Sequence, residues 1–410
     1  MPGLLYSAYQ KFYSALCSLD RFNKENSFFE NISSLDTFFS EFRNVTFVMQ
    51  KSLAHTDFLT VYNTNREKYL YDCKWFVEKR NETTKEYPFQ LVKQIEITLY
   101  FPSFKWQIFT QQFTVEDDME LSELIEQFKR LFYRINHIEV FFSAKFSFHE
   151  KSSQEDLYDK LMFGLQALTD FLDAMYADID EYCELCEDLK KRINEIKFPL
   201  IPRDMFLIND YAYYPEKDEF DRAQRVSLLL GENGLFNRTP LSNFNSKIFK
   251  ALGDDYFQKF VAMHVIMQNT ELLPTMMTIF DDNTFELDSF NADIKTTIYR
   301  KLNEAAMRIQ NEGIKEIYYM QVYVTCAFNL PHQNMTSKER SAHSEQELLA
   351  FMKVDNALNE EEYIFEGDKL NNMEYIISQI INGGSKELGL GRVNMTPIIE
   401  AFKRLQKEDS

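Results

Sequence analysis

The chain has 410 residues, of which 64 are acidic and 45 are basic, so its formal charge is −19. Phe and Tyr are abundant (38 and 22 residues), whereas Gly and Pro number only 11 and 10, which favours long helices over an all-β sandwich or barrel. The negative charge opposes non-specific binding to DNA and to anionic membranes.

The sequence also predicts where the protein works. It contains no apolar run long enough to span a bilayer, and Met1–Ser7 lacks the basic and apolar pattern of a secretory signal. Its five cysteines are scattered, as is typical of reduced thiols in the cytosol. We therefore expect a cytoplasmic protein that has no membrane segment.

The first ninety residues have a helical pattern. From Leu35 to Leu53 the apolar residues recur every three or four positions, and Ser33 and Ser34 precede them as candidate N-caps. A second helix is predicted from Asn65 to Asn81, with Pro88 as its outer limit.

The apolar period then changes from helix to strand. Alternating residues from Ile95 to Phe101 predict a half-buried strand, and Trp106 to Val115 supplies its partner in a hairpin. An amphipathic helix is predicted over residues 117–135, and a further strand over 138–148.

A heptad pattern of apolar residues occupies residues 153–196. We interpret this segment as one very long helix, or as two helices broken near Gly164. Between Leu161 and Leu189 there are eight acidic residues and no Lys or Arg, so the outer face is acidic. An intramolecular bundle helix and the seam of a coiled-coil dimer both fit this spacing.

Pro199 and Pro202 mark the best domain boundary. Beyond them we expect a central strand over residues 314–328 and a polar loop over 329–343. Helices are predicted over residues 239–258, 293–311, 344–358 and 370–381, and from Thr396 onward.

The predicted fold is mainly α, with an α+β second domain. Residues 1–198 would form a helical bundle that carries a small β-hairpin and one long heptad helix. Residues 203–410 would form the α+β C-terminal domain.

One short motif carries a chemical meaning. Arg80 and Asn81 stand at the C-terminal end of an amphipathic helix that follows another helix. This Arg80-Asn81 corner resembles the terminal signature of HEPN domains, which are small all-α bundles. The resemblance covers residues 30–90 and implies either a metal-independent RNA endonuclease or an inert or nucleotide-binding relative. The family places a His four to six positions after the Arg, whereas Glu86 stands six positions after Arg80 here.

That difference bears on catalysis. Metal-free RNA cleavage needs a cation to neutralise the phosphorane and a group with a pKa near neutrality to move protons. An ordinary carboxylate is ionised at neutral pH and repels phosphate, so Glu86 would need a strongly raised pKa to serve as a base. The alternative is that Arg80 and Asn81 cap the helix. A second pair, Arg43-Asn44, is interpreted as a polar contact within the bundle.

Other candidate sites are less specific. Cys183 and Cys186 have zinc-like spacing but lack a second ligand pair, and we interpret them as core residues in the middle of a helix. Lys338, Arg340 and His343 could bind an anion from a polar stretch, for which a solvated loop is the alternative. We expect no metal and no cofactor.

The sequence thus favours a protein-interaction or regulatory module without conventional catalysis. The HEPN resemblance implies a place in a prokaryotic defence or toxin–antitoxin system. The first alternative is an RNA endonuclease that uses Arg80, Asn81 and Glu86, and the second is a small-ligand sensor in the C-terminal domain. A protein partner or a homodimer is expected, RNA is a further candidate partner, and neither membrane nor non-specific DNA binding is expected.

Overall fold

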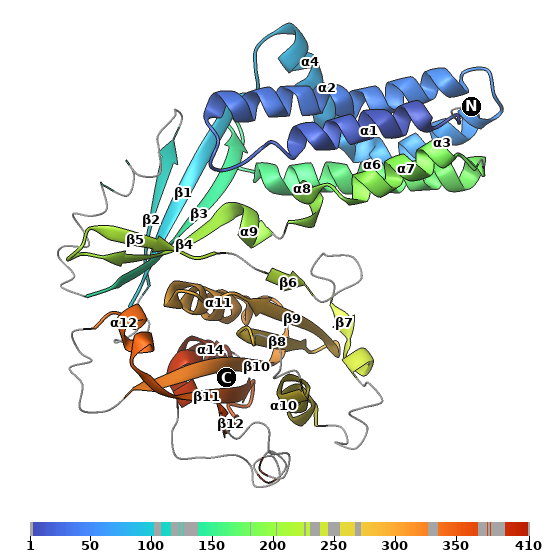
Figure 1. Cartoon of the computed structure of the whole chain (residues 1–410). Coiled ribbons are helices and arrows are strands. Elements are labelled where there is room, and N and C mark those ends of the chain that lie inside the picture. Colours follow the sequence, from blue (N-terminus) through green and yellow to red (C-terminus); the bar gives the residue numbers. More distant parts are fainter. Residues whose placement is uncertain are drawn as a thin grey trace. The chain divides into compact units, whose positions relative to one another are not determined.

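The computed structural model describes residues 3–101, 108–115, 123, 126, 138–180, 182–201, 203–224, 227–229, 238–244, 255–266, 272–326, 335–367, 375, 378 and 390–408. The chain combines helices with two antiparallel sheets, as the mixed fold class predicts (Figure 1). No helix in the described ranges has both the length and the apolar character needed to cross a membrane.

The residues cluster into two compact units. The first comprises Met1–Glu96, Gln112–Leu124 and Lys145–Ile208, and the second comprises Ile97–Gln111, Ile125–Ala144 and Asn209–Ser410. The division after Ile208 lies close to the predicted boundary at Pro199 and Pro202. Parts of the predicted β insertion, however, belong to the second unit.

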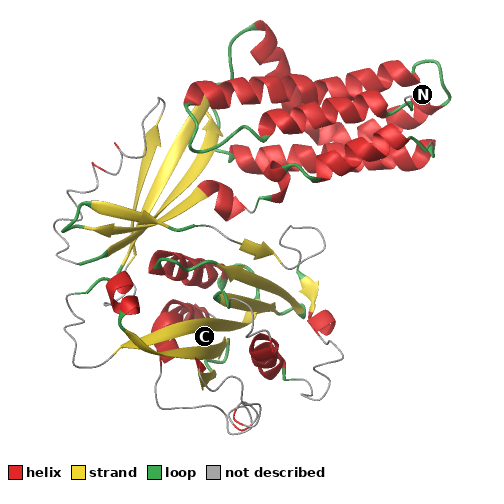
Figure 2. Cartoon of the chain, viewed as in Figure 1, coloured by secondary structure: helices red, strands yellow, loops and turns green. Residues whose placement is uncertain are grey.

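The first unit is predominantly helical (Figure 2). The helices α1, α2, α3, α6 and α7 form a bundle, and α4 packs on α2. Their bounds are α1 Tyr6–Leu19, α2 Phe28–Leu53, α3 Phe58–Leu70, η1 Tyr71–Cys73, α4 Lys74–Lys85, α6 Leu157–Ile179, α7 Glu184–Asn194, α8 Lys197–Leu200 and α9 Arg203–Leu207.

The helix α2 ends where the sequence predicts but starts earlier. Its N-cap is Ser27, whose hydroxyl accepts the backbone N–H of Glu30, while the Glu30 carboxylate accepts the Ser27 N–H. This capping box satisfies two N–H groups that would otherwise lack partners. The predicted caps Ser33 and Ser34 are wrong, because both lie inside the helix.

The single helix predicted from Asn65 to Asn81 is also wrong. A 3-10 turn over Tyr71–Cys73 separates α3 from α4 and buries Cys73. The turn directs α4 against α2, where the rings of Phe42 and Phe76 stack with centroids 4.4 Å apart.

The heptad segment forms two helices, α6 and α7, rather than one. The chain leaves α6 at Asp180, whose φ of 48° is left-handed, a conformation that Asp tolerates better than most residues. A break near Gly164 is wrong as well, because Gly164 lies within α6 beneath the ring of Phe76. The buried heptad residues join the core of this unit, as the bundle interpretation predicts: Leu165, Leu168, Leu172, Met175, Ile179 and Cys186.

A five-stranded sheet has the strand order β2-β1-β3-β4-β5. Its strands are β1 Leu91–Tyr100, β2 Ile108–Val115, β3 Val140–Glu150, β4 Ile208–Tyr214 and β5 Glu219–Arg222. The predicted hairpin of β1 and β2 and the predicted strand at 138–148 are confirmed. The predicted helix over 117–135 falls outside the described residues apart from single positions.

The second unit contains a sheet whose order is β12-β11-β10-β8-β9-β6, with β7 also paired to β9. The predicted central strand is confirmed as β10. The bounds are β6 Ser227–Leu229, β7 Thr239–Pro240, η2 Leu241–Phe244, α10 Tyr256–Ile266, β8 Thr275–Phe280, β9 Thr284–Phe290, α11 Lys295–Arg308, β10 Ile314–Cys326, α12 Ser337–Ala342, β11 Ser344–Asp355, β12 Glu360–Glu366 and α14 Leu390–Glu408.

Helices cover both faces of this sheet. Neighbouring residues of a strand point to opposite faces, so Tyr319 of β10 contacts the cluster that contains α11 and α14, while Tyr318 contacts the cluster that contains α10. The same division holds for Met276 and Met277 of β8. A sheet buried on both faces has long apolar runs instead of a clear alternation.

Several predictions for this unit are wrong. Residues 344–355 form the strand β11 instead of a helix, and Thr239-Pro240 pairs with β9 as β7 instead of starting a helix. The stretch predicted as a loop contains α12, and the last helix begins at Leu390. The predicted helix over 370–381 lies outside the described residues apart from Tyr375 and Ser378.

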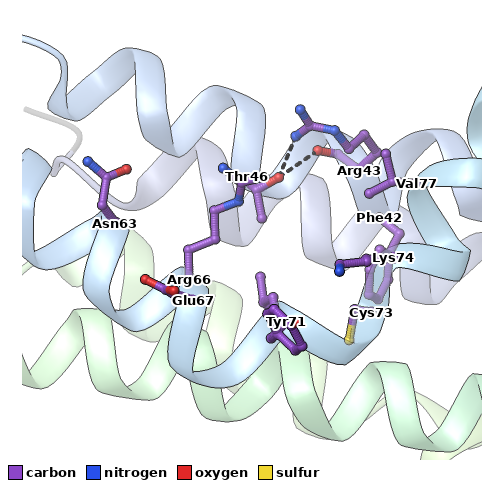
Figure 3. Close-up of a pocket in the computed structure, with 11 residues that line it drawn as sticks. Phe42, Arg43, Thr46, Asn63, Arg66, Glu67, Tyr71, Cys73, Lys74 and Val77 are labelled. Carbon is purple, nitrogen blue, oxygen red and sulfur yellow. Dashed lines mark hydrogen bonds between the residues drawn. The ribbon is translucent and has the colours of Figure 1, made fainter.

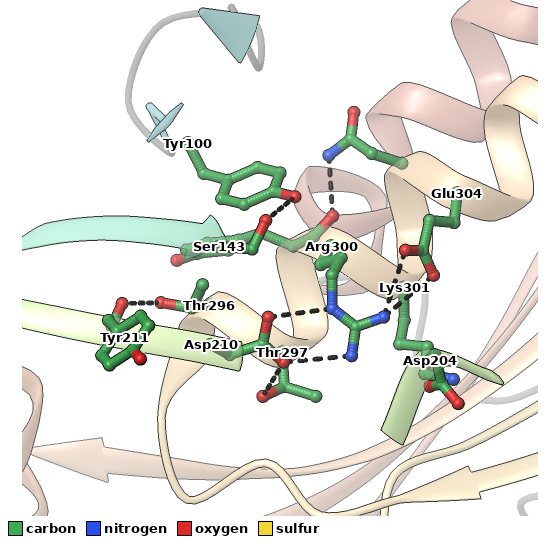
Figure 4. Close-up of polar contacts among 12 residues, drawn as sticks. Tyr100, Ser143, Asp204, Asp210, Tyr211, Thr296, Thr297, Arg300, Lys301 and Glu304 are labelled. Carbon is green, nitrogen blue, oxygen red and sulfur yellow. Dashed lines mark hydrogen bonds and ion pairs between the residues drawn. The ribbon is translucent and has the colours of Figure 1, made fainter. Parts of the chain in front are cut away.

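A buried ion pair fastens α11 to β4 (Figure 4). Arg300 donates from Nε and Nη2 to the two carboxylate oxygens of Asp210, at 2.9 and 3.0 Å, and both residues are buried. Thr297 donates to the same carboxylate at 3.1 Å, and Glu304 accepts from Arg300 Nη1. The contacts satisfy charges that burial would otherwise make costly.

Candidate functional site

Side chains on the inner face of α4 attach this helix to the strand β3. Lys79 forms ion pairs with Glu82, at 2.6 Å, and with Glu150 of β3, and Trp75 donates to Glu150 at 3.2 Å. Successive helical residues are about 100° apart, so the position after Lys79 turns away from the sheet.

Arg80 occupies that next position. Its Nη1 donates to Asn81 Oδ1 at 3.2 Å, while its Nε is buried and has no hydrogen-bond partner. A buried donor without a partner is costly, and an added acceptor stabilises it.

Two further arginines belong to the same region. Arg43 of α2 donates to the Thr46 hydroxyl at 2.6 Å, and the hydroxyl of buried Tyr62 donates to the Thr46 carbonyl at 3.1 Å. The Tyr62 bond holds α3 on α2. Burial raises the pKa of Tyr62, and the positive charges of Arg66 and Arg43 act in the opposite direction.

Arg43 is subject to the positive charge of the other two arginines. Burial lowers the pKa of Arg43 below its usual value, and the positive charges of Arg66 and Arg80 lower it further. Within the described part of the chain, none of the three guanidinium groups forms an ion pair; Arg43 donates to Thr46 and Arg80 donates to Asn81. We call Arg43, Arg66 and Arg80 the arginine cluster.

A pocket of about 340 Å³ opens beside the cluster (Figure 3). Among its described lining residues, Glu67 is acidic while Arg43, Arg66 and Lys74 are basic. Arg80 does not line the pocket, but its positive charge lowers the pKa of Arg43. The lining comes from α2, α3, η1 and α4: Phe42, Arg43, Thr46, Asn63, Arg66, Glu67, Leu70, Tyr71, Cys73, Lys74 and Val77.

The structure brings only part of the predicted catalytic set together. Arg80 and Asn81 are hydrogen-bonded to each other, but Glu86 is the exposed C-cap of α4, and its side chain forms no hydrogen bond or ion pair among the described residues. No histidine appears among the described residues that line the pocket. The described lining therefore offers basic groups that suit an anion, and it contains no histidine that could move protons.

The sequence missed Arg43 and Arg66 as site residues. Arg43 donates to Thr46 on its own helix α2, and the polar contact across the bundle that was predicted for it stays a prediction. Its sequence signal was the Arg43-Asn44 pair, which repeats Arg80-Asn81, but only the packing of α2, α3 and α4 shows that these arginines share one region.

The second predicted anion site is only partly assembled. Lys338 and Arg340 line a cavity of about 620 Å³ in the second unit, and His343 is not among its lining residues. Lys338 lies 3.7 Å from Asp221, and Arg340 lies 3.6 Å from Glu139. Each cation thus already faces a carboxylate, which weakens the attraction for an anion.

Cys183 and Cys186 are not in the middle of a helix, which corrects the sequence interpretation. Cys183 is the N-cap of α7, and both cysteines are buried and form no disulfide. The described residues contain no group of three or more His, Cys, Asp or Glu side chains arranged to hold a metal ion.

No family model, curated protein or solved structure matches the chain. The likeness to HEPN domains is carried by the Arg80-Asn81 corner and its helical setting alone. Function is therefore inferred from the geometry of the arginine cluster.

Proposed function

We propose that the helical first unit is an RNA-binding regulatory module that holds the phosphate backbone of single-stranded RNA at the arginine cluster and does not cleave it. The observation that supports this is the convergence of three guanidinium groups without an ion pair, in a chain whose formal charge is −19. The protein is acidic overall, yet among the described residues no carboxylate forms an ion pair with these three arginines, and the pocket lining holds Glu67 against Arg43, Arg66 and Lys74.

Phosphate is the ligand that best suits the cluster. A guanidinium group offers parallel N–H donors that match two phosphate oxygens, and charged hydrogen bonds of this kind are about twice as strong as neutral ones. A bound phosphate would also relieve the repulsion at Arg43.

A flexible single strand suits the pocket better than a duplex. Tyr71 lines the pocket and is 60% exposed, so it offers an aromatic ring beside the basic groups. Unpaired bases stack on such rings while arginines hold the backbone. The choice of RNA over DNA rests on the resemblance to HEPN domains.

Cleavage is not part of the proposal, because no described residue stands beside Arg80 and Asn81 as a proton-transfer group. Glu86 is exposed, and its side chain forms no hydrogen bond or ion pair with Arg80 or Asn81. The regulatory role, the cytoplasmic location and a place in a prokaryotic defence or toxin–antitoxin system belong to the same proposal. They rest on the resemblance and on cysteine usage, and a protein partner or homodimer stays a prediction.

The test is fluorescence anisotropy with end-labelled single-stranded RNA in EDTA. Arg43→Gln, Arg66→Gln and Arg80→Gln should each weaken binding by about tenfold, since each removes a charged phosphate contact. Lys51→Gln is the matched control, because Lys51 is an exposed cation in the last turn of α2 and lies outside the pocket lining.

Equal binding by all four variants would contradict the proposal. Cleavage of the RNA in EDTA that stops with Arg80→Gln would instead establish the endonuclease alternative.

A further inference from the structure

A cavity of about 620 Å³ has all of its described lining residues in the second unit. They come from β4, β5, β10, α12, the start of β3 and the first turn of α11. Sites for small molecules usually have volumes of about 300–1,000 Å³, so the cavity has room for a ligand of metabolite size. The described lining combines apolar side chains with four cations and three carboxylates, which are Arg222, Lys295, Lys338, Arg340, Glu139, Asp221 and Asp293.

The first turn of α11 is attached to β4 by hydrogen bonds (Figure 4). The hydroxyl of Thr296 donates to the carbonyl of Tyr211 at 2.6 Å, and the hydroxyl of Thr297 donates to the carboxylate of Asp210 at 3.1 Å. Lys295 directly precedes these two threonines as the first residue of α11. The bonds therefore fix the backbone that carries Lys295 into the cavity lining.

Two of the lining carboxylates already have partners. The side chain of Glu139 is 6% exposed and accepts the backbone N–H and the hydroxyl of Ser337 at 2.7 and 2.9 Å. Arg340 lies 3.6 Å from the same carboxylate, and Lys338 lies 3.7 Å from Asp221. Most of the charge in the described lining is therefore balanced before any ligand binds.

Lys295 differs from the other cations of the described lining. Its ammonium forms no hydrogen bond or ion pair within the described ranges, whereas Arg222 donates to Asn209 at 2.9 Å. Burial lowers the pKa of Lys295 and the positive charge of Arg340 lowers it further, while Glu139 acts in the opposite direction. An ammonium that is withdrawn from water without a contacting counter-ion behaves in this way.

The balance of charge indicates which anion suits the cavity. Four cations against three carboxylates leave one net positive charge in the described lining, and the three carboxylates repel a dianion more strongly than a monoanion. Phe141, Ile298 and Val322 add an apolar surface to the same lining. A ligand with one carboxylate and a hydrocarbon body matches both features.

We propose that this cavity binds a small monocarboxylate with an apolar or aromatic body, and that Lys295 pairs with its carboxylate. The ligand supplies the counter-ion that Lys295 lacks among the described residues, through a charged hydrogen bond that is stronger than a neutral one. Burial of the hydrocarbon body against Phe141, Ile298 and Val322 removes apolar surface from water. The proposal does not rest on RNA binding, because the arginine cluster belongs to the first unit.

The test is isothermal titration calorimetry of the full-length protein with benzoate, 3-phenylpropanoate and hexanoate. The corresponding amides are neutral probes of nearly the same shape, and 2-phenylethyl phosphate at pH 8 is the dianion. At least one carboxylate should bind saturably, and about tenfold more tightly than its amide or the phosphate, since only the carboxylate combines a single charge with the apolar body.

Two variants test the role of Lys295. Lys295→Met keeps the length of the side chain and should weaken carboxylate binding by about tenfold, while the weak binding of the amide stays the same. Lys315→Met is the matched control, because Lys315 is an exposed cation of β10 outside the described cavity lining. It should bind the carboxylate as the wild type does.

A second measurement needs no substitution. The wild-type protein is acetylated briefly with a dilute succinimidyl ester, and the modified lysines are mapped by mass spectrometry. The best carboxylate, at ten times its Kd, should slow the modification of Lys295 by up to about tenfold and leave that of Lys315 unchanged.

The proposal is overturned if no carboxylate binds at millimolar concentration, if each carboxylate binds only as well as its amide, or if Lys295→Met binds like the wild type. Unchanged modification of Lys295 in the presence of a bound carboxylate would also overturn it. Tighter binding of the phosphate than of any carboxylate would overturn the choice of a monoanion.

Discussion

Gly164 allows the close approach of α4 and α6. A Cβ added at residue 164 would lie 2.0 Å from Cζ of Phe76. Ordinary carbon contacts are about 3.5–4.0 Å, so one partner must move. Phe76 has little room, because its ring stacks on Phe42 at 4.4 Å and meets Trp75 edge-on at 5.0 Å.

Two opposing terms set the effect of Gly164→Ala on the free energy of unfolding. Alanine favours a helix interior over glycine by about 1 kcal/mol. Overpacking of a dense core costs about 1–3 kcal/mol, occasionally more, and a 2.0 Å approach lies at the severe end. We therefore expect a net loss of about 2 kcal/mol, although an alanine normally stabilises a helix.

Urea unfolding followed by tryptophan fluorescence measures this loss. A Trp106→Phe background leaves Trp75, which packs on Phe76, as the single reporter of the first unit. Ala177→Gly at an exposed position of α6 is the control for helix propensity and should cost about 1 kcal/mol.

The contact itself is isolated by a double-mutant cycle. Gly164→Ala combined with Phe76→Leu should lose about 1–2 kcal/mol less than the two single losses added together. If Gly164→Ala stabilises the unit, or if the two substitutions are additive, the proposed steric conflict is wrong.

Three further predictions test the fold. Ser27→Ala should destabilise the first unit by about 1 kcal/mol through loss of the capping box, while Ser33→Ala inside α2 should change urea stability little, and equal effects would refute this assignment. Burial lowers the pKa of His264 to about 4 from 6.5, so between these pH values only the unfolded state takes up the proton. The stability of the second unit should then fall by up to about 3 kcal/mol as the pH drops through this window, and His264→Phe should remove that fall. Arg300→Met leaves the Asp210 carboxylate buried without its cation and should cost about 3–5 kcal/mol in thermal or urea unfolding; a change below about 1 kcal/mol would contradict this role.

The spacing of apolar residues in the sequence correctly predicted those helices and strands that have one buried face and one more exposed face. The strand β1 and the end of α2 belong to this class, since one face of each is buried and the other is not. The strand β11 does not, because Leu348 to Met352 is a continuous buried apolar run that pairs with β10 and β12 at its edges and packs against helices on its faces. Such a run has no period that separates a strand from a helix.

Glycine and aspartate misled the prediction for the heptad segment. Gly164 was interpreted as a helix break, but its role is a close contact with Phe76 that no local pattern reveals. The actual break at Asp180 needs a left-handed residue, and the apolar spacing continues across it to Cys186.

The candidate site was half predicted. The Arg80-Asn81 corner came from a local motif, but Arg43 and Arg66 lie on other helices and join it only through packing. Residue type also could not show that Cys183 starts a helix, because that depends on where α6 ends.

The salt dependence of RNA binding tests the proposed function most directly. On single strands the logarithm of the affinity falls with the logarithm of the salt concentration by about 0.7 for each phosphate neutralised, so three arginines predict a slope near −2. The variant with Arg43, Arg66 and Arg80 all changed to Gln should bind weakly with a slope near zero, and the RNA should stay intact. The same slope in the wild type and in this variant would contradict the account.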